Sequence, residues 1–267
     1  MRREEVVQLS FGDRNSQKSL WGNFLRVAGP IGFVLVMLAA LLAIIVYSYF
    51  SNRRDALALS EEVLGAIERR IAGELDAFIV PIEDTVQLTA DFLENTPFDI
   101  RNRDLLEPLA FRVLDNLSQV SNFIVADLQG NFLMIARQPD GSLHTKIIER
   151  SGGAARATWI RRDPAGNVVD EETVFDDPYD PRERPWYTGA VTREEPNWSD
   201  FYIFFTSQTH GATISLPIMG KNDERLGVFG LDVELKEVSA FLETLKIGEN
   251  GEAIIIDEEG YIVAHPE

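Results

Sequence analysis

The chain has 267 residues, of which 45% are hydrophobic, and its 25 basic and 43 acidic side chains give a formal net charge of −18. This composition supports a folded core and excludes a disordered chain, and the negative charge argues against nucleic acid or anionic lipid headgroups as partners. Because there is no cysteine and His144, His210 and His265 lie far apart, we expect no disulfide bond, no local zinc motif and no cofactor.

The first predicted element is a membrane-spanning helix. The 26 residues between Arg26 and Arg53 carry no charge, and about 20 helical residues cross the hydrocarbon core of a bilayer. A cleaved signal peptide is the alternative, but its apolar region would be about 7 to 15 residues long and would end in small residues. This one ends in the sequence YSYFS. We therefore expect a cytoplasmic segment at residues 1–26 and a transmembrane helix at residues 27–50.

The charges that flank this helix are nearly balanced, so they do not decide its orientation. The residues after Arg54 hold 18 basic and 40 acidic side chains, and long domains cross membranes largely regardless of their charge. We expect a chain that crosses the cell inner membrane once, with its bulk in the periplasm or outside the cell.

A long amphipathic stalk helix is predicted next, at residues 51–95. Apolar residues recur from Leu64 to Leu93 with a mean spacing of about 3.6, the period of a helix with one apolar face. Pro81 is expected to kink this helix, and its start adjoins the membrane segment, so the two helices are expected to be nearly continuous. We expect a homodimer formed through the stalk, although a helix that simply covers a core would show the same stripe.

After the stalk, residues 96–235 are predicted to form one module. A helical pattern covers about residues 104–119, and strand patterns separated by turns follow it. The strands are expected at residues 123–137 (strand, turn, strand), 142–150, 155–162, 168–175, 201–217 and 225–234. The turn segments Pro217-Ile-Met-Gly and Asn222-Asp-Glu are expected between the last two. The sequence therefore predicts an α+β fold in which one antiparallel sheet is flanked by helices.

Residues 170–180 hold six carboxylates in eleven positions. Such a cluster could bind calcium, but it lacks the alternating spacing and the loop glycine of an EF-hand. We therefore predict no metal site here.

The stretch YDPRERPWY, from Tyr179 to Tyr187, is the strongest candidate for a functional site. Its two prolines disfavour helix just before them, which predicts a shaped loop that enters a helix near Arg184. Arg184 offers a planar fork of five donors to a carboxylate, and Trp186 and Tyr187 each combine an apolar ring with one polar tip. A small anionic or zwitterionic ligand would suit this combination. The alternative is that both rings are core anchors and that Arg184 pairs with a nearby acid.

The C-terminal residues repeat an earlier pattern. After the helical pattern LKEVSAFLETLKI, aligning Asp257 with Asp127 also brings Gly260 onto Gly130, with a period of 130 residues. This predicts the start of a second sheet module at residues 236–267. Only two of its strands are present, and a two-stranded hairpin is not stable alone, so we expect a fragment or strands that come from elsewhere.

This order of parts resembles the double-Cache family of extracytoplasmic sensor domains. The likeness covers roughly residues 30–267 and rests on the membrane helix, the stalk, a module with an RPWY loop, and a second module that opens KIGENGEAIIIDEEGYIVAHP. In that family each module is a PAS-like antiparallel sheet, the membrane-distal module usually binds the ligand, and a second membrane helix leads to a cytoplasmic output domain. The resemblance implies a membrane-anchored sensor of a small ligand for transmembrane signalling, as in a chemoreceptor.

Members of that family that bind amino acids carry a Tyr, four residues, an Arg, one residue and Trp-Tyr, followed by a more distant Tyr and Asp. The matching positions here are Tyr179, Arg184, Trp186 and Tyr187, with Tyr202 and Asp232 as the later partners. The resemblance implies that Arg184, Trp186 and Tyr187 hold the ligand carboxylate. It implies that Tyr179, Tyr202 and Asp232 hold the ligand ammonium. An amino acid is therefore the expected ligand, and another small carboxylate or amine is the alternative.

The chain contains no GxSxG motif, no phosphate-binding glycine loop and no HExxH motif. We therefore predict that it is not itself an enzyme. The alternatives are the truncated input region of a signalling enzyme, such as a histidine kinase, a diguanylate or nucleotide cyclase or a phosphatase, and an inactive gene remnant.

Overall fold

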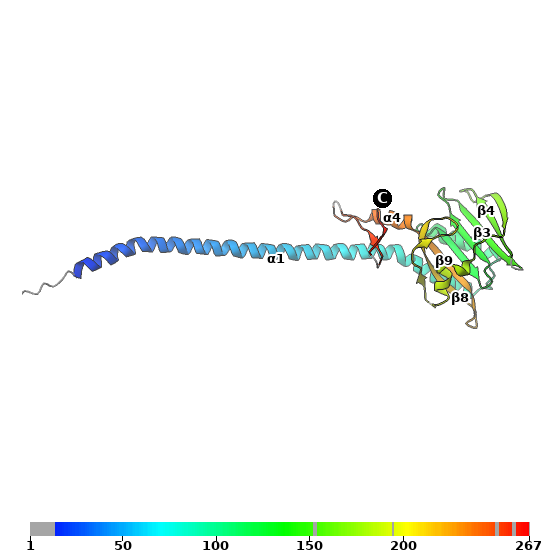
Figure 1. Cartoon of the computed structure of the whole chain (residues 1–267), viewed down its shortest axis with the longest axis horizontal. Helices are drawn as coiled ribbons and strands as arrows, with labels where there is room; N and C mark the ends of the chain where they lie inside the picture. Colours follow the sequence, from blue (N-terminus) through cyan, green and yellow to red (C-terminus); the bar gives the residue numbers. More distant parts are fainter. Residues whose placement is uncertain (1–13, 152–153, 194, 249–250, 258–259, 267) are drawn as a thin grey trace, which may run out of the picture. The chain divides into compact units, whose positions relative to one another are not determined.

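The computed structural model describes residues 14–151, 154–193, 195–248, 251–257 and 260–266 (Figure 1). The chain separates into two compact units, Met1–Ala66 and Ile67–Glu267. The boundary between them falls inside helix α1 (Arg14–Glu94).

In the first unit, α1 contains a stretch long and apolar enough to cross a membrane, and its large apolar side chains between Ile31 and Phe50 are exposed. The helix begins at Arg14, inside the segment that was expected to precede it. The predicted continuity of membrane helix and stalk is confirmed, because one helix runs from Arg14 to Glu94. It continues through Pro81, whose carbonyl accepts a hydrogen bond of 2.7 Å from the Thr85 hydroxyl. The kink at Pro81 stays a prediction.

The second unit is built on an antiparallel sheet, which confirms the predicted α+β fold. Its strands are β1 (Asn122–Asp127), β2 (Phe132–Arg137), β3 (Leu143–Ser151), β4 (Ala154–Arg162), β5 (Val168–Phe175), β6 (Asn197–Trp198), β7 (Tyr202–Ile203), β8 (His210–Met219) and β9 (Arg225–Glu234). They follow the order β5-β4-β3-β2-β1-β9-β8-β6, and β7 pairs with β8. The other elements are α2 (Arg103–Asn116), the 3-10 helix Pro181–Glu183, α3 (Pro185–Ala190), α4 (Leu235–Thr244), and a separate hairpin of β10 (Ile255–Ile256) and β11 (Ile262–Ala264).

Both faces of the central strand β1 are buried in apolar clusters, and successive side chains of a strand point to opposite faces. Phe123 and Val125 of β1 pack in a core with α2, α4 and the part of α1 that follows Ile67. Ile124 and Ala126 of the same strand belong to a second cluster with Trp186 of α3. We call this second side the α3 face. The Ser215 hydroxyl of β8 donates to the Trp186 carbonyl over 2.8 Å, which fixes α3 on that face.

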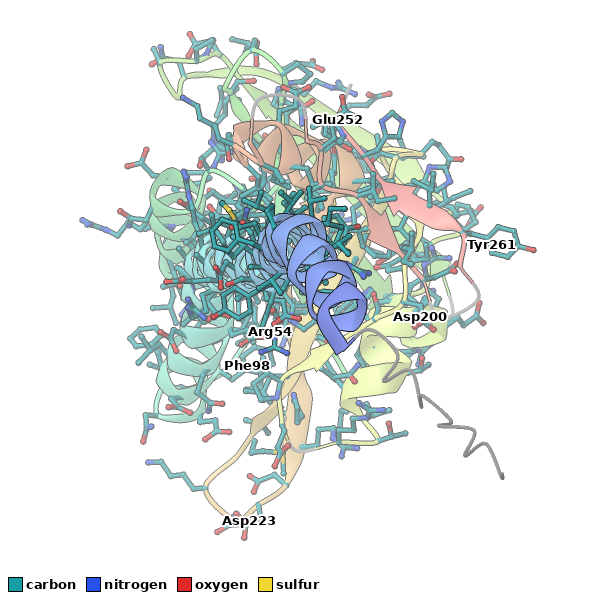
Figure 2. The ribbon with its side chains drawn as sticks, turned by 90° about the vertical axis from the view of Figure 1, so that its left-hand side faces the viewer. Arg54, Phe98, Asp200, Asp223, Glu252 and Tyr261 are labelled. Atoms are coloured by element: carbon teal, nitrogen blue, oxygen red, sulfur yellow. The ribbon has the colours of Figure 1, made fainter. Side chains whose placement is uncertain are left out.

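Two details of the predicted strands are wrong. The strand expected at residues 201–217 is interrupted, because β7 ends at Ile203 and a turn precedes β8, with φ of 56° at Gln208. Of the two turn segments expected between the last two strands, the one that begins at Pro217 is wrong, because β8 continues to Met219, whereas residues 222–224 lie in the connection to β9 as expected. Figure 2 shows Asp223 at the tip of the hairpin that joins β8 to β9. Among the described residues β6 pairs with β8 only as far as Ser215, so the proline lies at a sheet edge, where its missing N–H is tolerated.

The two aligned turns of the predicted repeat share one geometry. Asp127 and Asp257 each accept a hydrogen bond on Oδ1 from the backbone N–H four residues later, over 2.9 and 2.7 Å. Gly130 and Gly260 have φ of 82° and 89°, a conformation that side chains disfavour and glycine adopts freely. Tyr261 of the second turn projects outward and is 72% exposed (Figure 2).

Four of the six carboxylates of residues 170–180 form ion pairs with basic side chains. Arg161 pairs with Asp170 and Glu172, Lys146 with Asp177, and Arg182 with Asp180. Within the described part of the chain, no group of three or more His, Asp or Glu side chains is placed to hold a metal ion. The cluster therefore contributes ion pairs to the edge of the sheet.

Candidate ligand-binding site

A cavity of about 520 Å³ lies on the α3 face of the sheet. Its walls come from β1, β2, β3, β4 and β9, and from the segment that runs from the YDPRERPWY stretch through β7 to the turn before β8. Five of the six predicted site residues line it, namely Tyr179, Arg184, Trp186, Tyr202 and Asp232. The fold thus brings together residues that the sequence separates by up to 53 positions.

Tyr187, the sixth predicted residue, does not line the cavity. Its hydroxyl donates to the Asp127 carbonyl over 3.2 Å, and its ring meets the Trp186 ring edge-on with centroids 5.6 Å apart. Neighbouring side chains of a helix point in different directions, so Tyr187 and Trp186 reach different parts of the sheet. Tyr187 was expected to hold the ligand carboxylate, but the structure places it where it holds α3 to the end of β1.

Asp232 is buried in β9 with both carboxylate oxygens hydrogen-bonded. Thr213 Oγ1 donates to Oδ1 over 2.6 Å, and Asn122 Nδ2 donates to Oδ2 over 2.8 Å. These donors stand directly opposite Asp232 on β8 and β1. Burial raises the pKa of Asp232 to about 6, while the bonds from Thr213 and Asn122 act in the opposite direction. No cation among the described residues forms an ion pair with this carboxylate.

Tyr202 reaches Asp232 through Thr213. The Tyr202 hydroxyl lies 2.7 Å from Thr213 Oγ1. Because Thr213 gives its own hydrogen to Asp232, the Tyr202 hydroxyl must donate to Thr213. Burial raises the pKa of Tyr202, so this hydroxyl keeps its proton. Its lone pairs are left to accept a hydrogen bond from a ligand.

Arg184 immediately precedes α3, where its Nη2 donates to the Ile203 carbonyl over 3.0 Å. Its guanidinium lies over the rings of Tyr202 and Phe205, at 5.5 and 5.9 Å from their centroids. No carboxylate of the described residues pairs with it, so the alternative in which Arg184 is neutralised by a neighbouring acid is wrong for this part of the chain. The guanidinium has donors left for an anion.

Tyr179 and Trp186 are both core anchors and cavity walls. They are 7% and 1% exposed, and Trp186 Nε1 donates to the Tyr179 hydroxyl over 3.4 Å. The Tyr179 ring packs on Phe132 and Phe205, with centroids 4.7 and 5.3 Å apart. Burial raises the pKa of Tyr179 as well. These two residues therefore pack in the core and line the cavity at the same time.

The remaining wall holds residues that the sequence analysis did not identify. Ile124, Met134, Ala136 and Trp159 give it an apolar surface, and His144 and Arg161 lie among them. Each of these residues is on a strand, and Ile124, Met134, Ala136 and Trp159 belong to the cluster of the α3 face. Their periodicity predicts that they alternate in direction, but only the strand register shows that they share a cavity with Asp232.

A family model described as a Cache domain matches residues 51–267. Methyl-accepting chemotaxis protein McpG of Pseudomonas putida is 28% identical over 109 residues, which are 41% of this chain and 17% of McpG. Adenylate cyclase 1 of Rhizobium meliloti is 22% identical over 276 aligned residues, which cover 98% of this chain and 41% of the cyclase. The chain thus spans less than half the length of either curated relative.

Among solved structures, the fold is similar to the ligand-binding domain of the Pseudomonas aeruginosa amino acid chemoreceptor PctC in complex with GABA. The TM-score is 0.52 at 21% identity, and the match covers 78% of this chain and 77% of that one. This likeness concerns the fold.

Proposed function

Because the chain belongs to the Cache domain family, we propose that it is the extracytoplasmic sensor region of a membrane-anchored receptor and that its cavity binds a free amino acid. Two opposite charges in one cavity carry this proposal. Arg184 and Asp232 both line it, and neither forms an ion pair with another described residue. A zwitterion supplies the missing partner to each, and a hydrogen bond to a charged group is worth about 1.5 to 3 kcal/mol.

Each wall residue has a role in this proposal. Arg184 donates to the ligand carboxylate beside Trp186, and Asp232 accepts from the ligand ammonium. The hydroxyls of Tyr179 and Tyr202 accept further hydrogen bonds from the ammonium. Tyr202 can act only as an acceptor here, because its hydrogen is already given to Thr213. The PctC structure, which holds GABA, supports a ligand with one amine and one carboxylate.

We propose that α1 anchors the receptor in the cell inner membrane, with residues 1–26 in the cytoplasm and the rest of the chain after residue 50 in the periplasm. Residues 96–235 would be the membrane-distal module, and residues 236–267 would start the membrane-proximal one. The apolar residues Leu57, Leu59, Val63 and Leu64 of α1 are exposed, which supports a homodimer formed through this helix.

Strand β9 offers a route from the ligand to α1. Asp232 faces the cavity, while its neighbours Leu231 and Val233 lie in the core that contains Ile82 and Val86 of α1. A ligand can move α1 only if it binds one arrangement of β9 and α1 more tightly than another. We propose that the ammonium, by neutralising Asp232, supplies this difference.

A second candidate concerns the output. The match to adenylate cyclase 1 extends over 98% of this chain, whereas the match to McpG covers 41% of it. This difference favours the input region of a nucleotide cyclase as the alternative to a chemoreceptor. In both cases the chain described here is the sensing part and not the catalytic part.

Thermal melting of the purified chain in detergent tests the proposed function, with amino acids, simple amines and simple carboxylic acids as additives. We expect amino acids to raise the melting temperature of the wild type and to lose this effect in Arg184→Ala and Asp232→Ala. Stabilisation by amines alone or by carboxylic acids alone would contradict a site with two charged anchors.

A further inference from the structure

The two charged anchors are connected by a short series of contacts within the cavity wall. The Arg184 guanidinium covers the Tyr202 ring at 5.5 Å, and the Tyr202 hydroxyl bonds to Thr213 of β8. Thr213 is in turn the direct neighbour of Asp232. Much of the remaining wall is on β1, β2, β3 and β4, so a ligand held by both anchors finds room for its third Cα substituent over these strands.

The strand register shows what this substituent meets. Asp232 stands opposite Asn122 of β1, Asn122 opposite Ala136 of β2, and Ala136 opposite His144 of β3. Neighbouring strands are about 4.8 Å apart, so the Cα atoms of Ala136 and His144 are about 10 and 14 Å from that of Asp232. Asn122 is committed to Asp232 through its side-chain amide. Ala136 is therefore the first of these opposite residues whose side chain does not take part in holding Asp232.

Ala136 opens space in the cavity because its side chain is a single methyl group. Other alanines on the α3 face, Ala126 and Ala157, are fully buried against protein and do not line the cavity, whereas Ala136 does. Its neighbours in the wall are Ile124 and Met134, which stand opposite each other on β1 and β2. The wall on β1 and β2 beside the ammonium anchor is thus apolar, and the imidazole of His144 follows it on β3.

We propose that the ligand side chain lies over Ala136, that Ala136 determines how long this side chain can be, and that the cavity selects amino acids with long apolar side chains. This inference rests on the proposed function, since the two anchors orient the ligand. The cavity volume agrees with it, because about 520 Å³ is within the range of pockets that enclose ligands larger than alanine or glycine. A leucine or methionine side chain covers the surface of Ile124, Met134 and Ala136 and removes it from water.

Calorimetry with the full chain in detergent tests this, using glycine, alanine, leucine, methionine and glutamate. These ligands share both charged ends of the amino acid and differ in the side chain. For the wild type we expect leucine and methionine to bind at least about tenfold more tightly than alanine, the discrimination that one or more methylenes give in an apolar pocket. Tighter binding of alanine or glutamate than of leucine would overturn the proposed class.

Ala136→Leu fills the space above β2 and leaves both anchors in place. We expect it to weaken leucine and methionine at least about tenfold and alanine less than about threefold, because only the long side chains meet the new group. Ala136→Gly is the matched variant, which keeps the space open and should retain the wild-type order of ligands. If Ala136→Leu lowers the ligand-free melting temperature strongly, Ala136→Val takes its place with the same expectation.

The outcomes separate this inference from the proposed function. A wild type that binds none of the amino acids contradicts both. If the wild type binds the amino acids but Ala136→Leu weakens the binding of alanine and leucine equally, or weakens neither, only the role of Ala136 is contradicted.

Discussion

Thr213 and Asp232 stand directly opposite each other on β8 and β9, and the Thr213 hydroxyl donates to the Asp232 carboxylate over 2.6 Å. Asn122 holds the other carboxylate oxygen from β1. Because all three residues sit on paired strands, the carboxylate is held in position. Such preorganisation would lower the cost of ordering the site for the proposed ligand.

The first prediction concerns the pH dependence of binding. The pKa of Asp232 is raised from 3.8 to about 6, so its carboxylate is ionised above about pH 6 and neutral below. A ligand ammonium needs the ionised form, so affinity should fall by up to about tenfold per pH unit below pH 6. Calorimetry at several pH values between about 5 and 8, a range that includes the raised pKa, measures this change in affinity. His144 also lines the cavity, so His144→Ala is the control and should keep the dependence.

The second prediction concerns stability without ligand. An Asp whose folded-state pKa is raised carries no penalty below about pH 4, where it is neutral in both states, and the full penalty above about pH 6, where it must ionise while buried. Asp232→Asn removes this charge and keeps the shape, and its single amide oxygen can still accept from Thr213, although the bond accepted from Asn122 is lost. We expect it to stabilise the ligand-free protein by about 1 to 3 kcal/mol at pH 8, and by little at pH 4, because one pKa unit corresponds to about 1.4 kcal/mol. Melting curves of both proteins at the two pH values would show it, and equal melting temperatures at pH 8 would argue against a buried, uncompensated charge.

Much of this fold follows from sequence patterns. The periodicity of residues 51–95 predicts the stalk part of α1, and the alternating runs predict β3, β4 and β5 closely. The break between β7 and β8 was missed because FYIFF reads as a continuous strand, although the polar run TSQT that follows was a signal for a turn.

The site was predictable only in part. Arg184, Trp186 and Tyr179 share one short stretch, so the motif identified them. Asn122 and Thr213 contact Asp232 from 110 and 19 residues away, and only the register of β1, β9 and β8 brings them together. Without that register, no local pattern marks either residue as part of a site.

The third prediction distinguishes the roles of two tyrosines, Tyr187 in the YDPRERPWY stretch and Tyr202 in β7. Tyr187→Phe removes a hydrogen bond to the Asp127 carbonyl outside the cavity, so it should lower stability by about 1 kcal/mol and leave ligand affinity unchanged. Tyr202→Phe removes the bond to Thr213 and an acceptor beside the ammonium, so it should weaken an amino acid by about 3- to 10-fold. The two variants are matched in chemistry, and calorimetry with melting curves distinguishes them. A loss of affinity in Tyr187→Phe would restore its expected role at the carboxylate.

The last prediction concerns which charged end of the ligand each of the two anchors, Arg184 and Asp232, holds. Arg184→Ala and Asp232→Ala each leave one ligand charge without its partner. An unpaired charge in a buried site costs several kcal/mol, so either change should weaken an amino acid at least about 100-fold. A simple amine should depend on Asp232 alone, and a simple carboxylate on Arg184 alone, because each has only one charged end. Calorimetry with the amino acid, the matching amine and the matching carboxylic acid gives all six comparisons. If both variants bind the amino acid as the wild type does, Arg184 and Asp232 are structural residues and the YDPRERPWY stretch serves packing alone.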